Sequence, residues 1–414
     1  MKWQRILKEQ LKWTRSCSDD LRLSSSDAVE LYNNAPLHAL MRAAHARRLA
    51  MHPHGEVTYL VDRNINYTNV CTINCQFCSF YRAPGHEENY TQTYEEISER
   101  IRELEAIGGS RILMQGGVNP ALSMDWYVGL LQHLRKNHPT IDIDCFSPIE
   151  IQGMAAVCEM STLEVLQQLK KAGMHGLPGG GAEMLVDDVR KNVSPKKGAP
   201  ANWLRVMGEA QSLGLTTSAT NVIGFGEDFA ARVEHMRKIR NLQAHSLKHY
   251  GTGFTSFIAW PVQLETNTFG RRNRGQNKHV LGAGSSEYLR HLAISRLFLD
   301  NIEHIQASWP TMGIAVAQMA LLAGADDAGS TMMEENRLLE RRNWTPRKPN
   351  CNRQSSELDS NPVEETAITT VWTPPCWCLN WMNWSHRRRS SCCRSIEDDP
   401  YLATNVPAAV ADTV

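Results

Sequence analysis

The chain lacks a net charge and a long apolar run, and we expect no secretion signal. Its 44 lysine and arginine residues balance its 44 aspartate and glutamate residues, so the whole chain is not attracted electrostatically to nucleic acid or to an acidic membrane. No uninterrupted apolar stretch reaches the roughly 18 residues of a membrane span. Residues 1–9 are charged throughout, without the apolar core of a signal peptide. We therefore expect a cytoplasmic protein that binds neither nucleic acid nor membrane.

Cysteine, by contrast, is plentiful, with 11 in the chain. In a reducing compartment clustered thiols bind metals more often than they form disulfides. Cys71, Cys75 and Cys78 form a C-x₃-C-x₂-C array. This spacing fits three irons of a [4Fe–4S] cluster and leaves the fourth iron without a protein ligand. Two alternatives are a structural zinc site with His86 as fourth ligand, and three free buried thiols.

Short β-type runs alternate with helical patterns from Glu56 to about Leu322. The expected strands cover residues 56–62, 110–115, 141–146, 176–177, 216–223, 254–259 and 302–308, with helical patterns between most of them. Repeated βα units of this size predict a parallel sheet. About six to eight strands favour a (β/α) barrel over an open doubly wound sheet, and the site of such a barrel lies at the C-terminal strand ends.

Two helix starts are also visible as capping boxes, in which Ser or Thr is followed three residues later by Glu. Thr93 and Glu96 form one, and Ser161 and Glu164 the other. The second is expected to open a helix with Leu163, Leu166 and Leu169 directed inward.

The organisation outside the alternating region is different at each end. Residues 1–50 read as a helical segment, expected to cover one end of the main domain as a lid. The main domain is expected to span residues 51–336. Residues 337–414 show no helix or strand period, and we predict that they are disordered or an out-of-frame extension. Their cysteines do not have the spacing of a usual zinc finger.

Glycine-rich turns follow several expected strands. Gly116 and Gly117, after Met114 and Gln115, would let a ligand come close to the backbone. Gly179 to Glu183 places a carboxylate at another strand end. Gly224-Phe-Gly-Glu227 is not a dinucleotide fingerprint, because its third glycine is missing.

The cysteine array, with Phe77 between its last two thiols, resembles the signature of the radical S-adenosylmethionine (SAM) superfamily. The resemblance implies a [4Fe–4S] cluster held by Cys71, Cys75 and Cys78, and SAM bound at the open iron. One electron, from a donor such as flavodoxin or ferredoxin, then breaks a C–S bond of SAM. The released 5′-deoxyadenosyl radical is aimed by the protein at one C–H bond.

The same resemblance assigns roles to residues that follow the strands. Phe77 is expected near the adenosine of SAM, and Gln115, Gly116 and Gly117 near its ammonium. Glu183 is expected at the ribose hydroxyls or the ammonium. Arg190 is expected at the SAM carboxylate, the alternative being a solvated helix residue.

Longer motifs resemble a narrower family, the menaquinone-pathway enzymes of the futalosine route. The match covers about residues 25–336 and includes residues 62–71, 80–88, 112–117, 178–183, 257–260, 297–309 and 329–336. The chain is most similar to the dehypoxanthine futalosine cyclases (cyclic dehypoxanthinyl futalosine synthases). Alternatives are aminofutalosine synthase, the F420-precursor synthase subunit that joins tyrosine to a flavin-like base, and a zinc-stabilised binding protein without catalysis.

The resemblance implies a radical cyclisation of a small nucleoside-type substrate. The radical removes hydrogen from C4′ of the substrate ribose, the carbon radical attacks the attached benzoate ring, and loss of an electron and a proton restores aromaticity. His86, Glu87 and Glu88 are candidates for the base that takes this proton. Arg82 or Arg296 is a candidate partner for the substrate carboxylate.

Overall fold

The fold is described from a computed structural model, which describes residues 1–15, 21–273 and 276–330. Within them, parallel strands form one sheet in the order β1-β9-β8-β7-β6-β5-β4-β3-β2. The strands are β1 (Thr58–Leu60), β2 (Asp62–Ile65), β3 (Arg111–Met114), β4 (Asp142–Cys145), β5 (Gly176–Leu177), β6 (Thr216–Ile223), β7 (Phe254–Pro261), β8 (His304–Gln306) and β9 (Asp327–Ser330). The predictions for residues 337–414 lie outside the described residues, and the predicted domain boundaries stay predictions.

The two ends of this strand order meet. Strands β1 and β2 lie at opposite ends, yet only Val61 separates them in the chain. The carbonyl of Val61 accepts a hydrogen bond from the Ser110 backbone N–H at 3.3 Å, and the Ser330 hydroxyl donates to Asp62. The single strand expected at 56–62 is therefore two short strands, and the sheet curls into a nearly closed barrel. The barrel prediction is confirmed, and the open-sheet alternative is wrong.

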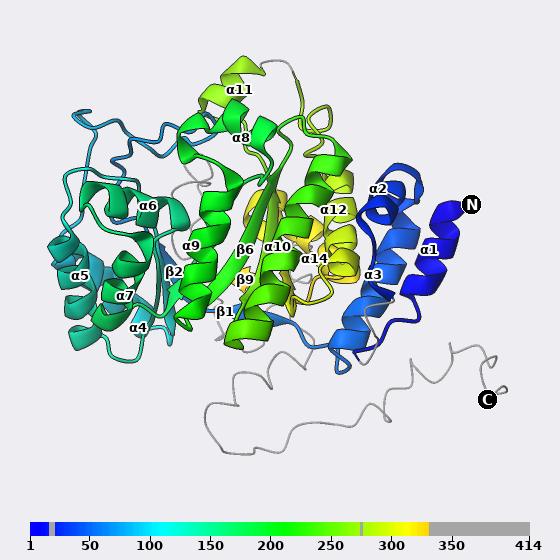
Figure 1. Cartoon of the computed structure of the whole chain (residues 1–414), viewed down its shortest axis with the longest axis horizontal. Helices are drawn as coiled ribbons and strands as arrows, with labels where there is room; N and C mark the ends of the chain where they lie inside the picture. Colours follow the sequence, from blue (N-terminus) through cyan, green and yellow to red (C-terminus); the bar gives the residue numbers. More distant parts are fainter. Residues whose placement is uncertain (16–20, 274–275, 331–414) are drawn as a thin grey trace, which may run out of the picture. The chain divides into compact units, whose positions relative to one another are not determined.

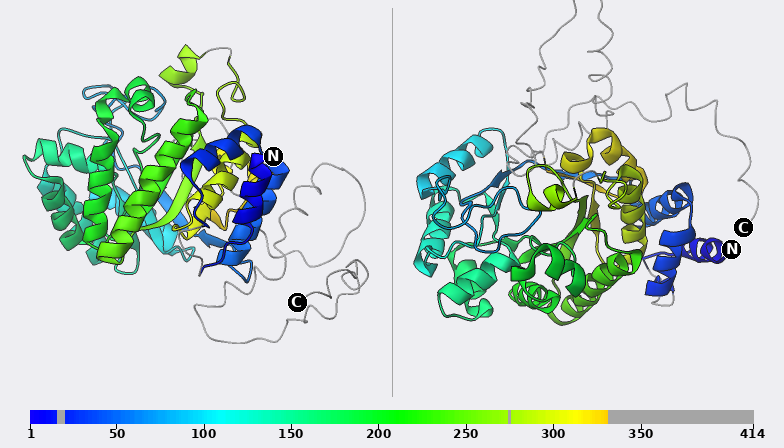
Figure 2. Two further views of the ribbon diagram at one scale, coloured as in Figure 1. Left: turned by 45° about the vertical axis from the view of Figure 1, so that its right-hand side comes forward. Right: turned by 90° about the horizontal axis from the view of Figure 1, so that it is seen from above.

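Helices surround the strands, as the view from above in Figure 2 shows. They are α4 (Tyr94–Glu105), α5 (Met124–Asn137), α6 (Pro148–Val157), α7 (Thr162–Ala172), α8 (Asp187–Val193), α9 (Pro200–Ser212), α10 (Phe229–Tyr250), α11 (Thr268–Arg272), α12 (Ser285–Phe298), α13 (Trp309–Met312) and α14 (Ile314–Leu322). Both predicted capping boxes are present, before α4 and before α7. None of the helices in the described part of the chain is long and apolar enough to span a membrane.

The core lies between the sheet and the helices. On α7 the fully buried residues include Val165, Leu166 and Leu169, whereas Leu163 is 36% exposed. Leu163 precedes Val165 by two residues and so points about 200° around the helix from it. The prediction that Leu163 faces inward is therefore wrong, although the predicted helix is present.

The N-terminal segment expected to be helical contains α1 (Lys2–Gln10), α2 (Ser25–Asn34) and α3 (Leu37–Met51). Helix α3 packs against α12, and α2 packs against α10 and α12. The Tyr32 ring stacks on Phe229 with 4.8 Å between centroids. Figure 1 shows this group beside the outer helices of the barrel. These helices cover a side of the barrel, so the expectation of a lid over one end is wrong.

Candidate active site

A pocket opens at the C-terminal ends of the strands, the end at which α8 and α11 lie in Figure 1. Its walls come from the loops that follow β2, β3, β4 and β5, together with Lys197. Its lining includes eight residues singled out from the sequence: Cys71, Cys75, Phe77, Cys78, Gln115, Gly116, Gly117 and Glu183. Neighbouring parallel strands end at one edge of the sheet, which brings these distant segments together.

The cysteine loop is held on both sides by backbone hydrogen bonds. The Cys71 N–H donates to the Arg82 carbonyl at 2.9 Å, and the Cys71 sulfur accepts from the Val118 N–H at 3.4 Å. The Gln76 N–H donates to the Val193 carbonyl at 3.0 Å and so ties the loop to α8. None of the three cysteines forms a disulfide.

The electrostatic setting of these thiols fits a metal cluster. Burial raises the pKa of the Cys75 thiol, and the nearby Lys197 ammonium works against that rise. A bound cation takes the place of the thiol proton, so a buried thiol becomes a ligand when metal is present. Three free sulfurs on the wall of one pocket, beside a lysine, are therefore suited to hold an iron–sulfur cluster.

The two glycines after β3 make room for the cysteine loop. A Cβ on Gly117 would lie 2.3 Å from the Val70 carbonyl oxygen and 2.6 Å from Cys71 Cβ, and one on Gly116 would lie 2.8 Å from the Tyr67 ring. The loop and Tyr67 thus already require glycine at both positions. The predicted contact of Gly116 and Gly117 with SAM stays a prediction.

Glu183 lies on the pocket wall in a strained backbone conformation, with φ of 40°. One carboxylate oxygen is 2.5 Å from the Lys197 ammonium, while the other, Oε2, is buried without a hydrogen-bond partner. An orphaned carboxylate oxygen in a pocket is a ready acceptor for a hydroxyl or an ammonium group. The position of Glu183 thus suits the SAM contact predicted for it, which stays a prediction.

Arg190 lies behind Glu183 and is only 2% exposed. Its guanidinium donates to the carbonyls of Gly181 and Ala182 at 3.0 and 2.8 Å, and lies 3.7 Å from Glu183 Oε2. The alternative of a solvated helix residue is therefore wrong. The contacts of Arg190 shape the turn that carries Glu183, and its predicted contact with the SAM carboxylate stays a prediction.

Sequence reasoning missed two charged residues of the pocket, Lys197 and Glu150. Glu150 accepts hydrogen bonds from the Tyr67 hydroxyl at 2.8 Å, the Ser147 hydroxyl at 2.7 Å and the Gly116 N–H at 3.0 Å. The sequence does mark the start of α6. Ser147 is a helix-capping residue, proline follows it directly, and Glu150 lies three residues later. Lys197 lies on a 3-10 turn of three residues, for which the sequence has no comparable signal.

The three predicted base candidates lie on an exposed loop and do not line the pocket. The Glu88 carboxylate is 2.5 Å from Arg82 Nε, which holds the pKa of Glu88 below its usual range. His86 accepts a hydrogen bond from the Glu88 N–H at 3.1 Å. Glu87 is likewise exposed. A base role for His86, Glu87 or Glu88 stays a prediction.

The two candidate partners of a substrate carboxylate are both engaged elsewhere. Arg82 pairs with Glu88 and donates to the Ser79 carbonyl at 3.1 Å. Arg296 is fully buried and pairs with Asp326, just before β9. Because the strands are parallel, Arg296 lies at the end of the barrel opposite the cysteine loop, so it cannot reach this pocket.

Two further aromatic rings pack behind Phe77, on the side away from the pocket. Phe77 packs against Phe225 with 5.4 Å between ring centroids, and Phe225 packs edge-on against Phe269 at the same spacing. The turn that carries Phe225 is closed by Glu227, which accepts from the Phe225 N–H at 2.7 Å and pairs with Arg232 at 2.8 Å. Phe77 is thereby held at the pocket wall.

A nearly closed parallel barrel, with three free thiols in a C-x₃-C-x₂-C loop at its C-terminal strand ends, defines a radical SAM enzyme. The sequence matches two family profiles, the Radical SAM superfamily over residues 65–239 and the CofH/MqnC C-terminal region over residues 251–340. Among solved structures, methylornithine synthase is similar with a TM-score of 0.61 and 17% identity, over 84% of this chain and 92% of that one. This likeness concerns the fold alone.

Curated relatives show which group of radical SAM enzymes the chain resembles. The cyclic dehypoxanthine futalosine synthase of Halalkalibacterium halodurans is 42% identical over 76% of this chain and 82% of its own length. That of Streptomyces coelicolor is 38% identical over 76% of both chains. The 5-amino-6-(D-ribitylamino)uracil–L-tyrosine 4-hydroxyphenyl transferase of Methanopyrus kandleri is 36% identical over 72% of this chain and 78% of its own.

The chain therefore belongs to the radical SAM family that comprises the cyclic dehypoxanthine futalosine synthases and their tyrosine 4-hydroxyphenyl transferase relatives. It is an enzyme whose cofactors are a [4Fe–4S] cluster and SAM. The alternative of a zinc-stabilised binding protein without catalysis is wrong.

Proposed function

We propose that this chain cyclises dehypoxanthine futalosine to cyclic dehypoxanthinyl futalosine in menaquinone biosynthesis. The two futalosine synthases support this reaction, at 42% and 38% identity over most of the chain. The observation that carries the proposal is the pocket itself. Three free thiols and a carboxylate, one oxygen of which has no hydrogen-bond partner, line the same pocket at the end of a radical SAM barrel.

Each cofactor has a set of residues suited to hold it. In the proposed site Cys71, Cys75 and Cys78 would hold the cluster, and Phe77 and Glu183 would contact SAM. When bound, the cluster and SAM supply a carbon-centred radical that takes hydrogen from the ribose C4′ of the substrate. Glu183 Oε2 would accept a hydroxyl or ammonium hydrogen of SAM, and Lys197 holds the other oxygen of Glu183 in place.

The cyclisation also requires a proton acceptor close to the benzoate ring. Among the described residues, Glu150 and Glu183 are the carboxylates on the pocket wall. Glu183 faces Lys197 at 2.5 Å, which favours Glu150 as the acceptor over Glu183. Tyr67 and Ser147 orient the carboxylate of Glu150. We place Glu150 ahead of the exposed His86, Glu87 and Glu88 for this reason. The accompanying electron requires a one-electron acceptor, a role that the oxidised iron–sulfur cluster would fill.

The test is a substrate-dependent assay of SAM cleavage with anaerobically reconstituted, reduced protein. Dehypoxanthine futalosine is expected to yield both 5′-deoxyadenosine and the cyclised nucleoside. A second candidate function is the tyrosine transfer named for the Methanopyrus relative, tested with tyrosine and 5-amino-6-(D-ribitylamino)uracil. The substrate of aminofutalosine synthase is a third arm. Turnover only in the second or third arm would overturn the cyclase proposal.

The cluster ligands are tested by Cys75→Ala. Two remaining thiolates cannot complete the three-ligand set, so the variant is expected to lose labile sulfide, visible absorbance and SAM cleavage together. Cys158→Ala is the matched control, because Cys158 is a free cysteine at the end of α6, outside the pocket lining. The control is expected to keep all three properties. Full SAM cleavage by Cys75→Ala would contradict the assignment.

A further inference from the structure

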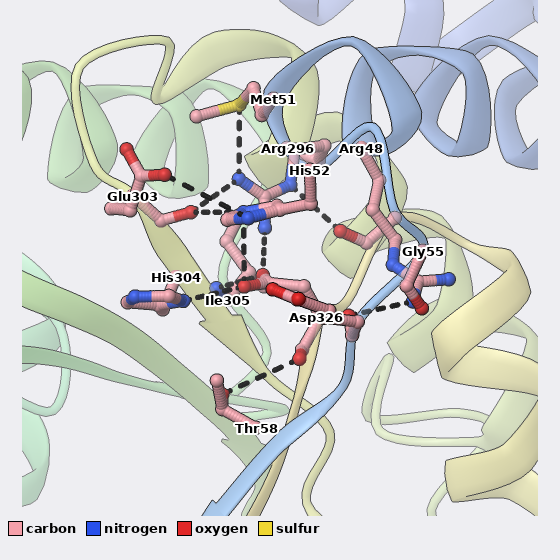
Figure 3. Close-up of polar contacts among 12 residues, drawn as sticks. Arg48, Met51, His52, Gly55, Thr58, Arg296, Glu303, His304, Ile305 and Asp326 are labelled. Carbon is pink, nitrogen blue, oxygen red and sulfur yellow. Dashed lines mark hydrogen bonds and ion pairs between the residues drawn. The ribbon is translucent and has the colours of Figure 1, made fainter. Parts of the chain in front are cut away.

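Two histidines and an aspartate meet at the end of the barrel opposite the cysteine loop (Figure 3). His52 follows the last residue of α3, His304 is the first residue of β8, and Asp326 directly precedes β9. Each offers one ligand atom within 4.8 Å of the other two. The cofactor site uses none of these residues.

A single carboxylate oxygen faces both imidazoles. Asp326 Oδ2 lies 2.6 Å from His304 Nδ1 and 3.1 Å from His52 Nε2. The two rings lie nearly parallel, with 5.4 Å between centroids and 21° between planes. Two nitrogens and one oxygen thus converge on one small volume.

The rest of the aspartate is held so that this oxygen keeps its direction. Oδ1 of Asp326 pairs with the fully buried Arg296 and accepts the Ile305 N–H at 2.8 Å. Arg296 also donates to the Gly324 carbonyl at 2.7 Å, which fixes the guanidinium. Oδ2 therefore remains directed at the histidines while Oδ1 satisfies the arginine.

A second carboxylate stands behind one of the rings. Glu303 Oε1 lies 3.8 Å from Nδ1 of His52, the nitrogen on the far side of the ring from Asp326. A histidine that binds metal through one nitrogen commonly presents its other nitrogen to a carboxylate or a carbonyl, which sets its tautomer. At 3.8 Å the Glu303 carboxylate lies on this side of His52 but makes no hydrogen bond to it, and it is paired with Arg15. His52 Nε2 also lies 3.2 Å from the Glu303 carbonyl oxygen, a hydrogen bond that metal binding would replace.

We propose that His52 Nε2, His304 Nδ1 and Asp326 Oδ2 form a site for a divalent transition metal of the zinc class. Zinc bonds of about 2.0–2.1 Å in a tetrahedral site put ligand atoms about 3.3 Å apart. The His52–Asp326 spacing is close to that value. The shorter His304–Asp326 spacing must widen, and the His304 side chain, 33% exposed, is free on one side to do so. Its exposure also leaves a fourth position open to water.

The site has charges of both signs around it. Asp327, which follows Asp326 directly, favours a cation, and so does Glu303, although Arg15 pairs with the Glu303 carboxylate at 2.5 Å. Arg296 and Arg48 oppose it, but Arg48 turns its guanidinium to the carbonyls of Gly55 and Leu321. A hydrogen-bonded cluster that binds no metal is the competing explanation, and the experiment below distinguishes the two.

Metal here would join elements from distant parts of the chain. His52 ends an N-terminal helix, and His304 and Asp326 flank β8 and β9. The Asp326 carbonyl also accepts the Thr58 N–H of β1 at 2.9 Å. A cation at this point would therefore clamp the N-terminal helices to the barrel beside its closure, and the melting temperature should rise with metal because only the folded state binds it.

The experiment titrates Zn²⁺, and separately Co²⁺, into the anaerobically reconstituted full-length holoenzyme. The wild type is expected to bind one equivalent more than His304→Gln, with a d–d absorption band for Co²⁺ and a higher melting temperature with Zn²⁺. Thiols elsewhere in the chain are common to both proteins and cancel in this difference. His38→Gln, at an exposed position on α3, is the matched control and should behave as the wild type.

Two further variants keep the proposal open to refutation. His52→Gln should lose the same equivalent as His304→Gln, and Glu303→Gln should weaken zinc binding by about tenfold or more. Circular dichroism establishes that each variant is folded. Equal zinc content and equal melting shifts in wild type, His304→Gln and His52→Gln would overturn the metal site and leave a hydrogen-bonded cluster. None of these results bears on the substrate of the cysteine site.

Discussion

His235 on α10 shows how burial fixes the charge state of a single side chain. The ring is wholly buried, and its Nδ1 accepts the Leu185 N–H at 2.9 Å. Burial lowers the pKa of His235 from 6.5 to about 3. The folded enzyme thus holds this imidazole neutral at any pH at which it is assayed.

The pH dependence of stability follows from that difference. Because the unfolded chain takes up the proton near pH 6.5 and the folded chain only near pH 3, stability is lost as pH falls through this window. The loss from His235 is about 1.4 kcal/mol per pH unit. His235→Gln keeps an acceptor for Leu185 without the titration, so its free energy of unfolding should fall less between pH 6.5 and 5. Urea unfolding at both pH values measures this, and equal losses in both proteins would contradict it.

At the residue scale the sequence was informative where the chemistry is local. Cys71, Cys75 and Cys78 lie within eight consecutive residues, so their common role was visible without a fold. Glu150 and Lys197 reach the pocket from two other connections of the barrel. Only the packing of the strands brings them to the cysteines. The helix start at Ser147 can mark α6 in the sequence, but not the place of Glu150 in the pocket. His86 was proposed because it is near the cysteines in sequence; it lies outside the pocket lining, and its role as a base stays a prediction.

At the scale of the elements, the contact of the cysteine loop with the end of β3 leaves no room for a side chain at Gly117. Gly117→Ala would place a methyl group 2.3 Å from the Val70 carbonyl oxygen, and a backbone atom cannot swing away as a flexible side chain does. We expect a loss of about 1–3 kcal/mol in stability and a lower iron content per chain. Iron analysis and urea unfolding measure both effects.

Gly208→Ala is the matched control for this change. Gly208 lies within α9, where an added Cβ meets only Leu242, at 3.5 Å. A helix interior favours alanine over glycine by up to about 1 kcal/mol, so the control should keep its iron and gain slightly in stability. Full iron content and wild-type stability in Gly117→Ala would contradict this prediction, because the cysteine loop would then be able to move away from the added methyl group.

Whether an element could be predicted depended on how strongly its own residues mark it. The capping boxes at Thr93 and Ser161 predict α4 and α7, because the capping residue and its glutamate lie only three residues apart in the sequence. Strand β9, Asp327-Ala-Gly-Ser330, has no β-branched or aromatic residue and was missed. It forms because β1 and β8 offer it hydrogen-bonding edges on both sides. The division at Val61 was missed as well, since only the closing of the sheet separates the two strands.

For the whole molecule, closure of the barrel depends on a few polar links near Val61. Asp62 is 2% exposed, accepts from the Ser330 hydroxyl of β9, and pairs with Arg111 of β3 at 2.6 Å. One carboxylate thus joins strands from both ends of the sheet order. Arg111 retains Asp144 at 3.2 Å when Asp62 is removed, which softens the loss, but the hydrogen bond from the Ser330 hydroxyl to Asp62 is lost.

Asp62→Ala should therefore destabilise the whole barrel. Breaking a buried ion pair from one side costs about 3 kcal/mol or more, and the urea midpoint should fall accordingly. Glu99→Ala removes an exposed ion pair with Arg102 on α4 and should leave the midpoint unchanged, because exposed pairs contribute little. Asp62→Asn keeps an acceptor for Ser330 and should lie between the two. If Asp62→Ala unfolded at the same urea concentration as Glu99→Ala, the barrel would have to be held closed by its backbone ladder and apolar core alone.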